Sequence, residues 1–518
     1  MQWTVGTISS AIRFGWYPIG GSLPLQRPDA SRSSAPAAIA SPTGNGDAST
    51  DVLLILVAGA YLIASLAGLP LYADGGHYLF RIIVDGVPYV PDGRLAAVIP
   101  QLPAWFAARL DTGLAAIRLA FSVSYLLLPL VSLLTCWLIL RRTAPWLMVL
   151  PATGALLNQI NASGVSELLA LIDLMWPLVL ALSLEGHRRG VRSLVWLAGP
   201  LMVTLHPVSL LACLTLALAV WLTSRDLRLT IWLGICALGR LAWSLMGLSG
   251  YEQSHLVGDG ALWYLLTQTP GQHAMLAVVT LIGLAVTWES GSRSGRLPRW
   301  MPRVAAGLLL VAAALVGHEL IWGQGWRLKS GITFVVQLGL MMAVTLSVPV
   351  ANGRRGSTPL GSDIRWSSVR DAALFAIAAL MLVKTAAWWT ATRGLQNLVS
   401  EPGGPCIQHT RQAPFALQWP WMAPIDEWNA PMNALLFRPD FRPSGSENLA
   451  PIAVLLPRDG CARAAATGMA YMTPWLPVSW TRLEQHFGPL RPMIPNPPME
   501  RRAWIQAPKP TPRTGSGL

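Results

Sequence analysis

The sequence predicts an all-α polytopic membrane protein with a small extracytoplasmic domain at its C-terminal end. Hydrophobic residues make up 53% of the 518 residues and charged residues 12%, about half the roughly 25% charged content of soluble globular proteins. The mean hydropathy is +0.45. Long apolar runs recur along the chain, many near the roughly 20 residues that cross a bilayer as a helix. These observations exclude an ordinary soluble enzyme and a disordered or fibrous protein.

Residues 1–50 are rich in Ser, Ala, Pro and Gly. Such a segment cannot bury enough apolar surface to offset the entropy that ordering costs. It also lacks the compact apolar stretch and small-residue cleavage site of a signal peptide. We therefore predict a disordered cytoplasmic tail over residues 1–50, followed by a first membrane helix that acts as an uncleaved anchor.

The transmembrane domain is predicted over residues 51–390, with outer-face loops between its helices. About eleven apolar runs fit membrane helices: 52–71, 115–140, 145–160, 167–184, 193–206, 208–223, 229–249, 273–289, 304–322, 331–349 and 372–390. The fifth and sixth runs are short and meet at His206-Pro207. Because proline cannot continue the helical hydrogen-bond ladder, the sequence predicts a tight hairpin or a broken helix there.

The net charge of +13 reflects arginines in the loops between apolar runs. With the N-terminus in the cytoplasm, the inside loops hold 15 arginines, whereas the outside loops hold only Arg81, Arg94, Arg109, Arg327 and Lys329. This bias follows the positive-inside rule. The basic composition therefore indicates topology, and no nucleic-acid-binding motif accompanies it. We predict a multi-pass protein of the inner (plasma) membrane with a cytoplasmic N-terminus and an extracytoplasmic C-terminus; its oligomeric state stays open.

Residues 391–518 form the predicted outer domain, which is rich in Pro and Trp and contains short extended stretches such as PIAVLLP. A segment of this length can form a small domain. It contains Cys406 and Cys461, whereas the other three cysteines fall in predicted spans. Two thiols in an oxidising compartment favour a disulfide, and two buried thiols are the alternative.

The densest polar segment follows the first predicted helix. It reads YADGGHYLFR over residues 72–81 and precedes the amphipathic run LAAVIPQLPAWFAARL, which predicts a helix lying at the membrane interface. A carboxylate at Asp74 is then partly desolvated, which raises its pKa toward the range useful for a general base. The alternative is a solvated loop in which Asp74 caps the following turn.

This arrangement resembles the GT-C class of membrane glycosyltransferases. Members have an acidic residue in the first outside loop, often followed closely by Tyr, then an interfacial helix and the second span, and they use a polyprenyl-phosphate sugar donor. The matching residues here are Asp74, His77 and Tyr78. The resemblance implies that Asp74 is the catalytic residue and that His77, Tyr78 and Arg81 bind substrate. Members often have an acidic pair in this loop, whereas Gly75 follows Asp74 here, which argues against a bound metal.

Further candidates for substrate binding lie near the outer end of the ninth predicted helix. His318 and Glu319 end that helix, and Arg327 and Lys329 follow it. The two cations suit a phosphate group. His with carboxylate also suits transition metals, but no paired-His spacing is present. We therefore predict no cofactor, with a divalent metal as the weaker alternative.

Arg240 lies in the middle of a predicted span, where a charged residue is costly and indicates a functional site by default. It requires a carboxylate or a phosphate, and Asp173 is one candidate partner. A structural ion pair between the two is the alternative to a ligand site.

The function predicted from these observations is transfer of a hexosyl or pentosyl group from a polyprenyl-phosphate donor to an acceptor on the outer face. The expected partners are membrane lipid and the lipid-linked donor. No GxxxxGK[ST], GxSxG, CxxC or dinucleotide fingerprint is present. Two alternatives stay open: a secondary transporter with a midplane cavity around Asp173 and Arg240, and a non-enzymatic assembly subunit.

Overall fold

The computed structural model describes residues 46–493, apart from residues 73, 160–164, 187, 248–269, 292–297, 299, 323–330, 354–359, 409–428, 439–448, 458 and 474. The described residues are mostly helical. The predicted tail lies outside them except for its last five residues, which already belong to the first helix. This helix begins at Gly46, where the apolar run that follows stabilises a continuous helix.

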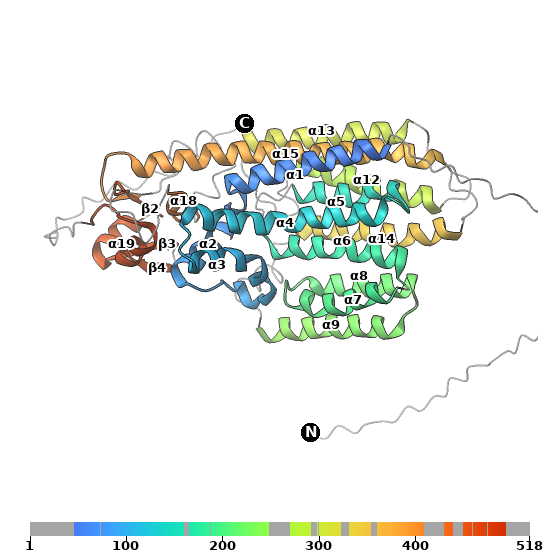
Figure 1. The fold of residues 1–518 in the computed structure, drawn as a ribbon, viewed down its shortest axis with the longest axis horizontal. Coiled ribbons are helices and arrows are strands. Elements are labelled where there is room, and N and C mark those ends of the chain that lie inside the picture. Colours follow the sequence, from blue (N-terminus) through green and yellow to red (C-terminus); the bar gives the residue numbers. More distant parts are fainter. Residues whose placement is uncertain are drawn as a thin grey trace, which may run out of the picture. The chain divides into compact units, whose positions relative to one another are not determined.

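A set of long helices runs side by side through the described chain (Figure 1). They are α1 (Gly46–Ala67), α4 (Leu114–Leu140), α5 (Val149–Asn158), α6 (Glu167–Glu185), α7 (Arg189–Val203), α8 (Ser209–Thr223), α9 (Leu227–Gly247), α12 (Pro270–Gly291), α13 (Met301–Trp322), α14 (Gly331–Gly353) and α15 (Leu360–Ser400). Each of the eleven predicted runs overlaps one of them. Within the described residues, seven are long and apolar enough to cross a membrane: α1, α4, α6, α9, α12, α13 and α15. The count of eleven crossings therefore stays a prediction.

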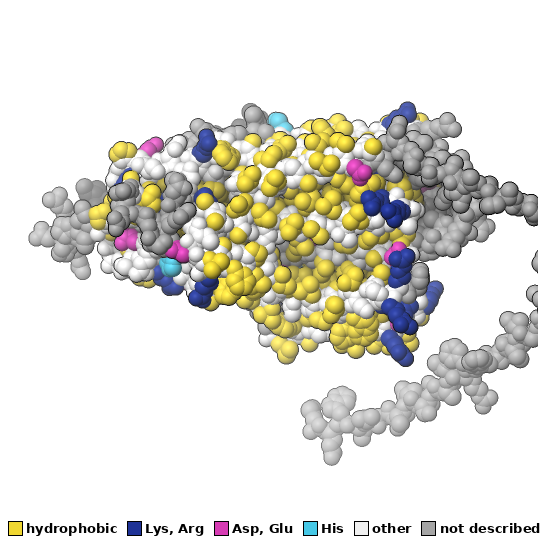
Figure 2. Space-filling model, viewed as in Figure 1, with side chains coloured by type: hydrophobic (Ala, Val, Ile, Leu, Met, Phe, Trp, Pro, Cys, Tyr) yellow, Lys and Arg dark blue, Asp and Glu magenta, His cyan; other side chains and the backbone are white. Residues whose placement is uncertain are grey.

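The outward surface of these helices is apolar, as Figure 2 shows along the side of the molecule, with Lys and Arg at both ends of the apolar surface and more of them at the right-hand end. Ile55, Leu197 and Leu245 are 70%, 73% and 79% exposed. Large contiguous apolar surfaces are rare on soluble monomers. A hydrocarbon environment accounts for them, because it is as apolar as these side chains.

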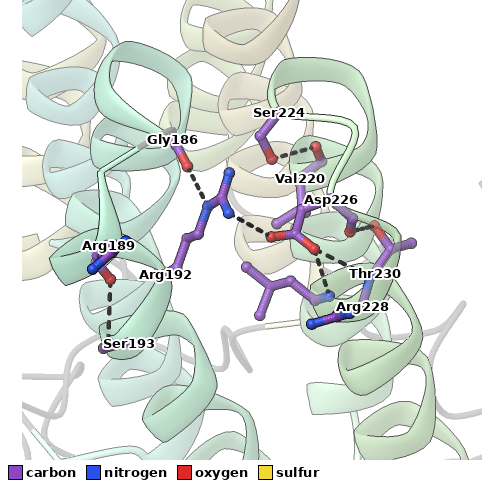
Figure 3. A network of polar contacts seen from close by, with 10 residues as sticks. Gly186, Arg189, Arg192, Ser193, Val220, Ser224, Asp226, Arg228 and Thr230 are labelled. Atoms are coloured by element: carbon purple, nitrogen blue, oxygen red, sulfur yellow. Dashed lines mark hydrogen bonds and ion pairs between the residues drawn. The ribbon is translucent and has the colours of Figure 1, made fainter.

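One polar network ties the ends of α7 and α9 together in a region predicted to face the cytoplasm (Figure 3). Arg192 donates to the carbonyl oxygen of Gly186 at 3.2 Å and forms an ion pair with Asp226, also at 3.2 Å. Asp226 in turn accepts from the backbone N–H groups of Arg228 and Leu229. The carboxylate therefore caps the first turn of α9 while it holds α7 beside it.

The turn at His206-Pro207 resolves the choice left by the sequence in favour of a hairpin. Helix α7 ends at Val203 and α8 begins at Ser209. The Ser209 N–H donates to the carbonyl oxygen of His206 at 3.0 Å. The two helices pack against each other, so the proline ends one helix instead of bending a continuous one.

Short helices connect α1 to α4: η1 (Leu69–Leu71), α2 (Asp74–Asp85), η2 (Pro91–Gly93), η3 (Leu95–Gln101) and α3 (Leu102–Arg109). Gly68 ends α1 in the left-handed conformation, with φ of 71°, which suits glycine. Along η3 and α3, Ile99, Phe106 and the following Leu110 are exposed. This exposure is what we expect of the predicted interfacial helix.

The C-terminal region begins later than the sequence predicts. Helix α15 continues through residue 390 to Ser400, because the first strong helix breakers are in the run Pro402-Gly403-Gly404-Pro405. Beyond it come β1 (Cys406–Gln408), α18 (Ala430–Leu436), β2 (Val454–Leu456), α19 (Gly460–Thr467), β3 (Met469–Thr473), β4 (Leu476–Ser479) and α20 (Trp480–Phe487). Strands β1 and β2 pair in parallel, and β3 and β4 pair antiparallel.

This C-terminal region is docked on the helices by specific contacts. Arg118 of α4 donates to the carbonyl oxygen of Leu436 at 2.8 Å. The Phe437 ring lies 5.6 Å from that of Trp388 on α15. On the other side of the region, the rings of Phe80 on α2 and Phe487 on α20 stack at 5.4 Å. Helix α2 is therefore held between the membrane helices and the C-terminal region.

The predicted disulfide between Cys406 and Cys461 is confirmed. It joins β1 to α19. Cys136, Cys213 and Cys236 are free and buried.

Replacing both bonded cysteines by serine should destabilise the C-terminal region by about 4 kcal/mol, because the bond closes a long loop and restricts the unfolded chain. The sequence separation of 55 residues sets that loop. Thermal unfolding with protease digestion as the readout measures the change. Cys213→Ser is the matched control, since that thiol is buried and unbonded. A double variant that resists digestion as well as the control would contradict the prediction.

Candidate functional site

Asp74 begins α2 directly after a tight turn at the end of α1. It is half-buried and interacts electrostatically with Tyr78 and Tyr125. The next residue, Gly75, packs so closely on η1 that a Cβ atom there would lie 1.8 Å from the carbonyl oxygen of Pro70. No side chain fits at that position. This close approach explains why glycine, and not a second acidic residue, follows Asp74.

A buried carboxylate lies beside this first turn. Tyr78 donates from its hydroxyl group to Oε1 of Glu167 at 2.7 Å, and Arg94 forms an ion pair with Oε2 at 2.8 Å. The Glu167 side chain is only 6% exposed. Burial raises the pKa of Tyr78 well above its ordinary value, and the charge of Glu167 raises it further. Tyr78 is therefore a phenol at neutral pH and stays a donor.

An aromatic and cationic cluster adjoins Tyr78. It consists of His77 and Arg81 on α2 and Tyr89, which follows that helix. The His77 ring lies 5.1 Å from that of Tyr89, and the Arg81 guanidinium lies over the same ring at 5.2 Å. Arg81 also pairs with Asp85 one turn later. The structure thus brings His77, Tyr78 and Arg81 together, and it adds Tyr89 and Glu167.

Arg240 approaches the same end of the molecule from α9. It is 2% exposed and donates to the carbonyl oxygen of Val203 at 3.2 Å. Both Arg240 and Arg94 act electrostatically on His206, so two guanidinium groups lie around the α7–α8 turn. The candidate pairing of Arg240 with Asp173 is not seen, since Asp173 accepts from Asn158 instead.

Asp173 and Lys384 line a small cavity among α1, α4, α6 and α15, with a volume of about 50 Å³. Its lining also includes Tyr125 and Ser166, and Ser166 immediately precedes Glu167. A volume of this size with several polar side chains in its lining is large enough to admit a water molecule. Polar groups therefore continue from the Glu167 cluster into the membrane-spanning part of the chain.

The remaining predicted residues lie apart from this cluster or outside the described chain. Glu319 accepts from the backbone N–H of Gly271 at 2.8 Å, so it caps the first turn of α12. His318 is exposed. Arg327 and Lys329 lie outside the described residues. Among the described residues, no group of three or more His, Cys, Asp or Glu side chains is arranged to hold a metal ion.

Sequence reasoning missed Glu167 and the role of Arg94. The sequence did contain a signal for Glu167. This carboxylate is the first residue of an apolar helix, after Ser166 and before Leu168, and a residue in that position is expected at a membrane boundary. Its pairing with Arg94 joins residues 73 positions apart, which no local pattern reveals. Comparison of the chain with protein-family models, curated proteins and solved structures finds no match.

Glu167→Gln should lower the free energy of unfolding by about 3–5 kcal/mol, because it leaves the buried Arg94 without its charged partner. Thermal denaturation in detergent micelles measures this change. Glu185→Gln is the matched control: its pair with Arg188 is exposed, and exposed pairs are worth about 1 kcal/mol or less. Equal losses of unfolding free energy in Glu167→Gln and Glu185→Gln would contradict the assignment. It would also be contradicted if the double variant Glu167→Gln/Arg94→Gln lost as much stability as the two single variants added together.

The stability should also depend on pH through His77. Burial lowers the pKa of His77 to about 4; nearby Arg81 acts in the same direction and Asp85 against it. The unfolded chain, with an ordinary pKa of about 6.5, therefore binds the proton first as pH falls. As pH falls from about 6.5 to about 4, protonation of this histidine in the unfolded chain should lower the free energy of unfolding by about 3 kcal/mol.

Melting temperatures of His77→Gln across this pH range test the prediction. The variant should lose less stability on acidification than the wild type. His318→Gln is the control, because that side chain is exposed. Parallel pH curves for wild type and His77→Gln would refute it.

Proposed function

We propose that the chain is an integral membrane glycosyltransferase that moves a sugar from a polyprenyl-phosphate donor to an acceptor at the outer face. The observation that carries this proposal is Asp74, a half-buried carboxylate fixed by the Pro70–Gly75 contact and next to the Tyr78–Glu167–Arg94 cluster.

In the proposed reaction, an acceptor hydroxyl oxygen attacks C1 of the donor sugar. The bond between C1 and the phosphate oxygen breaks, and polyprenyl phosphate leaves with the bonding electrons. Asp74 takes the hydroxyl proton. A partly desolvated carboxylate suits this step, and the rigid first turn of α2 holds it in one place, which limits the entropy lost on reaching the transition state.

The departing phosphate requires positive charge around it. Arg240 supplies a guanidinium group beside the α7–α8 turn, where it acts electrostatically on His206, whereas Arg94 is already neutralised by Glu167. Guanidinium groups bind phosphate oxygens in bidentate geometry. Arg327 and Lys329 stay proposed phosphate ligands from the sequence alone. The outer location and the donor class rest on the arginine bias of the loops and on the GT-C resemblance.

Asp74→Asn should keep the fold and lower the transfer rate by about 10²- to 10⁴-fold, the usual contribution of a general base. The assay incubates purified protein with a radiolabelled polyprenyl-phosphate sugar and measures labelled acceptor. Asp226→Asn is the matched control, since it removes a carboxylate at the α7–α9 network far along the chain. Full activity in Asp74→Asn would exclude the assigned role.

Secondary transport is a second candidate function. The observation that favours it is the polar cavity lined by Asp173 and Lys384 within the helices, because intramembrane ionisable groups commonly mark substrate or ion pathways. Solute uptake into proteoliposomes that is abolished by Asp173→Asn, with no sugar transfer, would replace the first proposal by this one.

A further inference from the structure

A second cavity lies at the opposite end of α2 from Asp74, with a volume of about 380 Å³. This size falls in the range of small-molecule sites. Three parts of the chain enclose it: the last turn of α2, helix α3 with the start of α4, and helix α20 of the C-terminal region through His486. Since the cavity is lined by segments far apart in sequence, it exists only in the docked structure.

One side of the cavity is apolar and adjoins the membrane helices. Ile82 of α2 faces it together with Leu114 and Ile117, which lie in the first turn of α4, a candidate membrane span. Beside the cavity, Phe106 and Leu110 are 55% and 74% exposed. Exposed apolar residues on an interfacial helix indicate contact with lipid. An apolar chain in the outer leaflet can therefore lie against this side.

The charged side chains that line the other side are Asp85, Asp111 and Arg109. Asp85 pairs with Arg81 and lies 3.7 Å from Arg482, and Arg109 donates to the carbonyl oxygen of Gly86 at 3.0 Å. An anionic phosphate requires cations that no carboxylate offsets. Hydroxyl groups, by contrast, donate to carboxylates and accept from guanidinium groups. Because two carboxylates and only one guanidinium group line the cavity, the lining disfavours a phosphate and favours a neutral, hydroxyl-rich group.

Two side chains remain available to such a group. The Asp111 carboxylate, exposed at the cavity rim, makes no hydrogen bond within the described part of the chain. Its backbone is left-handed, with φ of 53°. Burial lowers the pKa of His486, with Arg482 acting in the same direction and Asp85 against it. The imidazole is thus neutral at pH 7 and both donates and accepts.

We propose that this cavity binds a glycolipid, with its apolar chain against Leu114 and Ile117 and its sugar hydroxyls on Asp111, Arg109 and His486. The cavity lies about 17 Å from Asp74, because helix α2 rises by that distance over the 11 residue steps from Asp74 to Asp85. A sugar bound there lies out of hydrogen-bond reach of Asp74, so this binding is separate from the proposed transfer reaction and does not depend on it.

The test measures lipid retained by the full-length chain in native mass spectrometry. The probes are monoglucosyl diacylglycerol, phosphatidylglycerol and phosphatidylcholine of matched acyl chains, each added without sugar donor. We expect glucosyl diacylglycerol to bind at least fivefold more tightly than either phospholipid. A preference for phosphatidylglycerol would overturn the proposal in favour of an anionic-lipid site, and equal retention of all three would overturn it outright.

Two variants locate the site. Ala108→Phe should abolish the glucolipid preference by filling the cavity, and Asp111→Asn should weaken binding about fivefold, because asparagine tolerates the left-handed backbone but lacks the charge. Asp459→Asn is the matched control, since Asp459 is also left-handed, with φ of 63°, but it lies at the start of α19, outside the cavity lining. Unchanged binding in folded Asp111→Asn and Ala108→Phe proteins overturns the proposal. A protein that binds the glucolipid through these residues yet transfers no sugar refutes only the proposed function.

Discussion

The structure depends on one buried carboxylate, Glu167, and on the two groups that neutralise and bind it. Removing a charge from water costs several kcal/mol unless it is paired and hydrogen-bonded. Tyr78 and Arg94 meet that requirement from α2 and from the loop after it. Because both come from the segment between α1 and α4, whereas Glu167 begins α6, the pairing fixes this connecting segment on the membrane helices. The position of Asp74, one turn before Tyr78, follows from this constraint.

The same segment is held from its other side by the C-terminal region. Phe487 stacks on Phe80, and Gly76 packs against Asn433 so closely that a Cβ atom would lie 2.5 Å from its Oδ1 atom. Helix α2 therefore has a face for each neighbour: Tyr78 toward α6 and small residues toward α18. A carboxylate held on so constrained a helix loses little entropy when it engages a substrate, which is the physical basis of the proposed catalytic role.

The sequence predicted those features that depend on composition or on residues close to one another along the chain. Apolar runs located the helices, His206-Pro207 located a turn, and two cysteines in a polar region located the disulfide. It placed the end of α15 ten residues too early, because the chain after residue 390 stays helical to Ser400 and buries Ala391, Leu395 and Val399 in the core. It could not find the Glu167–Arg94 pair or the contact of Gly75 with Pro70, since each depends on how segments pack and not on a local pattern. Asp74, His77 and Tyr78 lie together on α2, as expected of residues so close in sequence, and their functional roles stay predictions.

The central claim is that Asp74 acts on a lipid-linked sugar at the outer membrane face. Sealed proteoliposomes of known orientation test it most directly, with radiolabelled polyprenyl-phosphate sugar in the bilayer and a membrane-impermeant acceptor on one side only. We expect labelled product when the acceptor is on the side of the C-terminal region, and none when it is on the other side. Labelled product only with the acceptor on the side of the arginine-rich loops, or no product on either side, would contradict it.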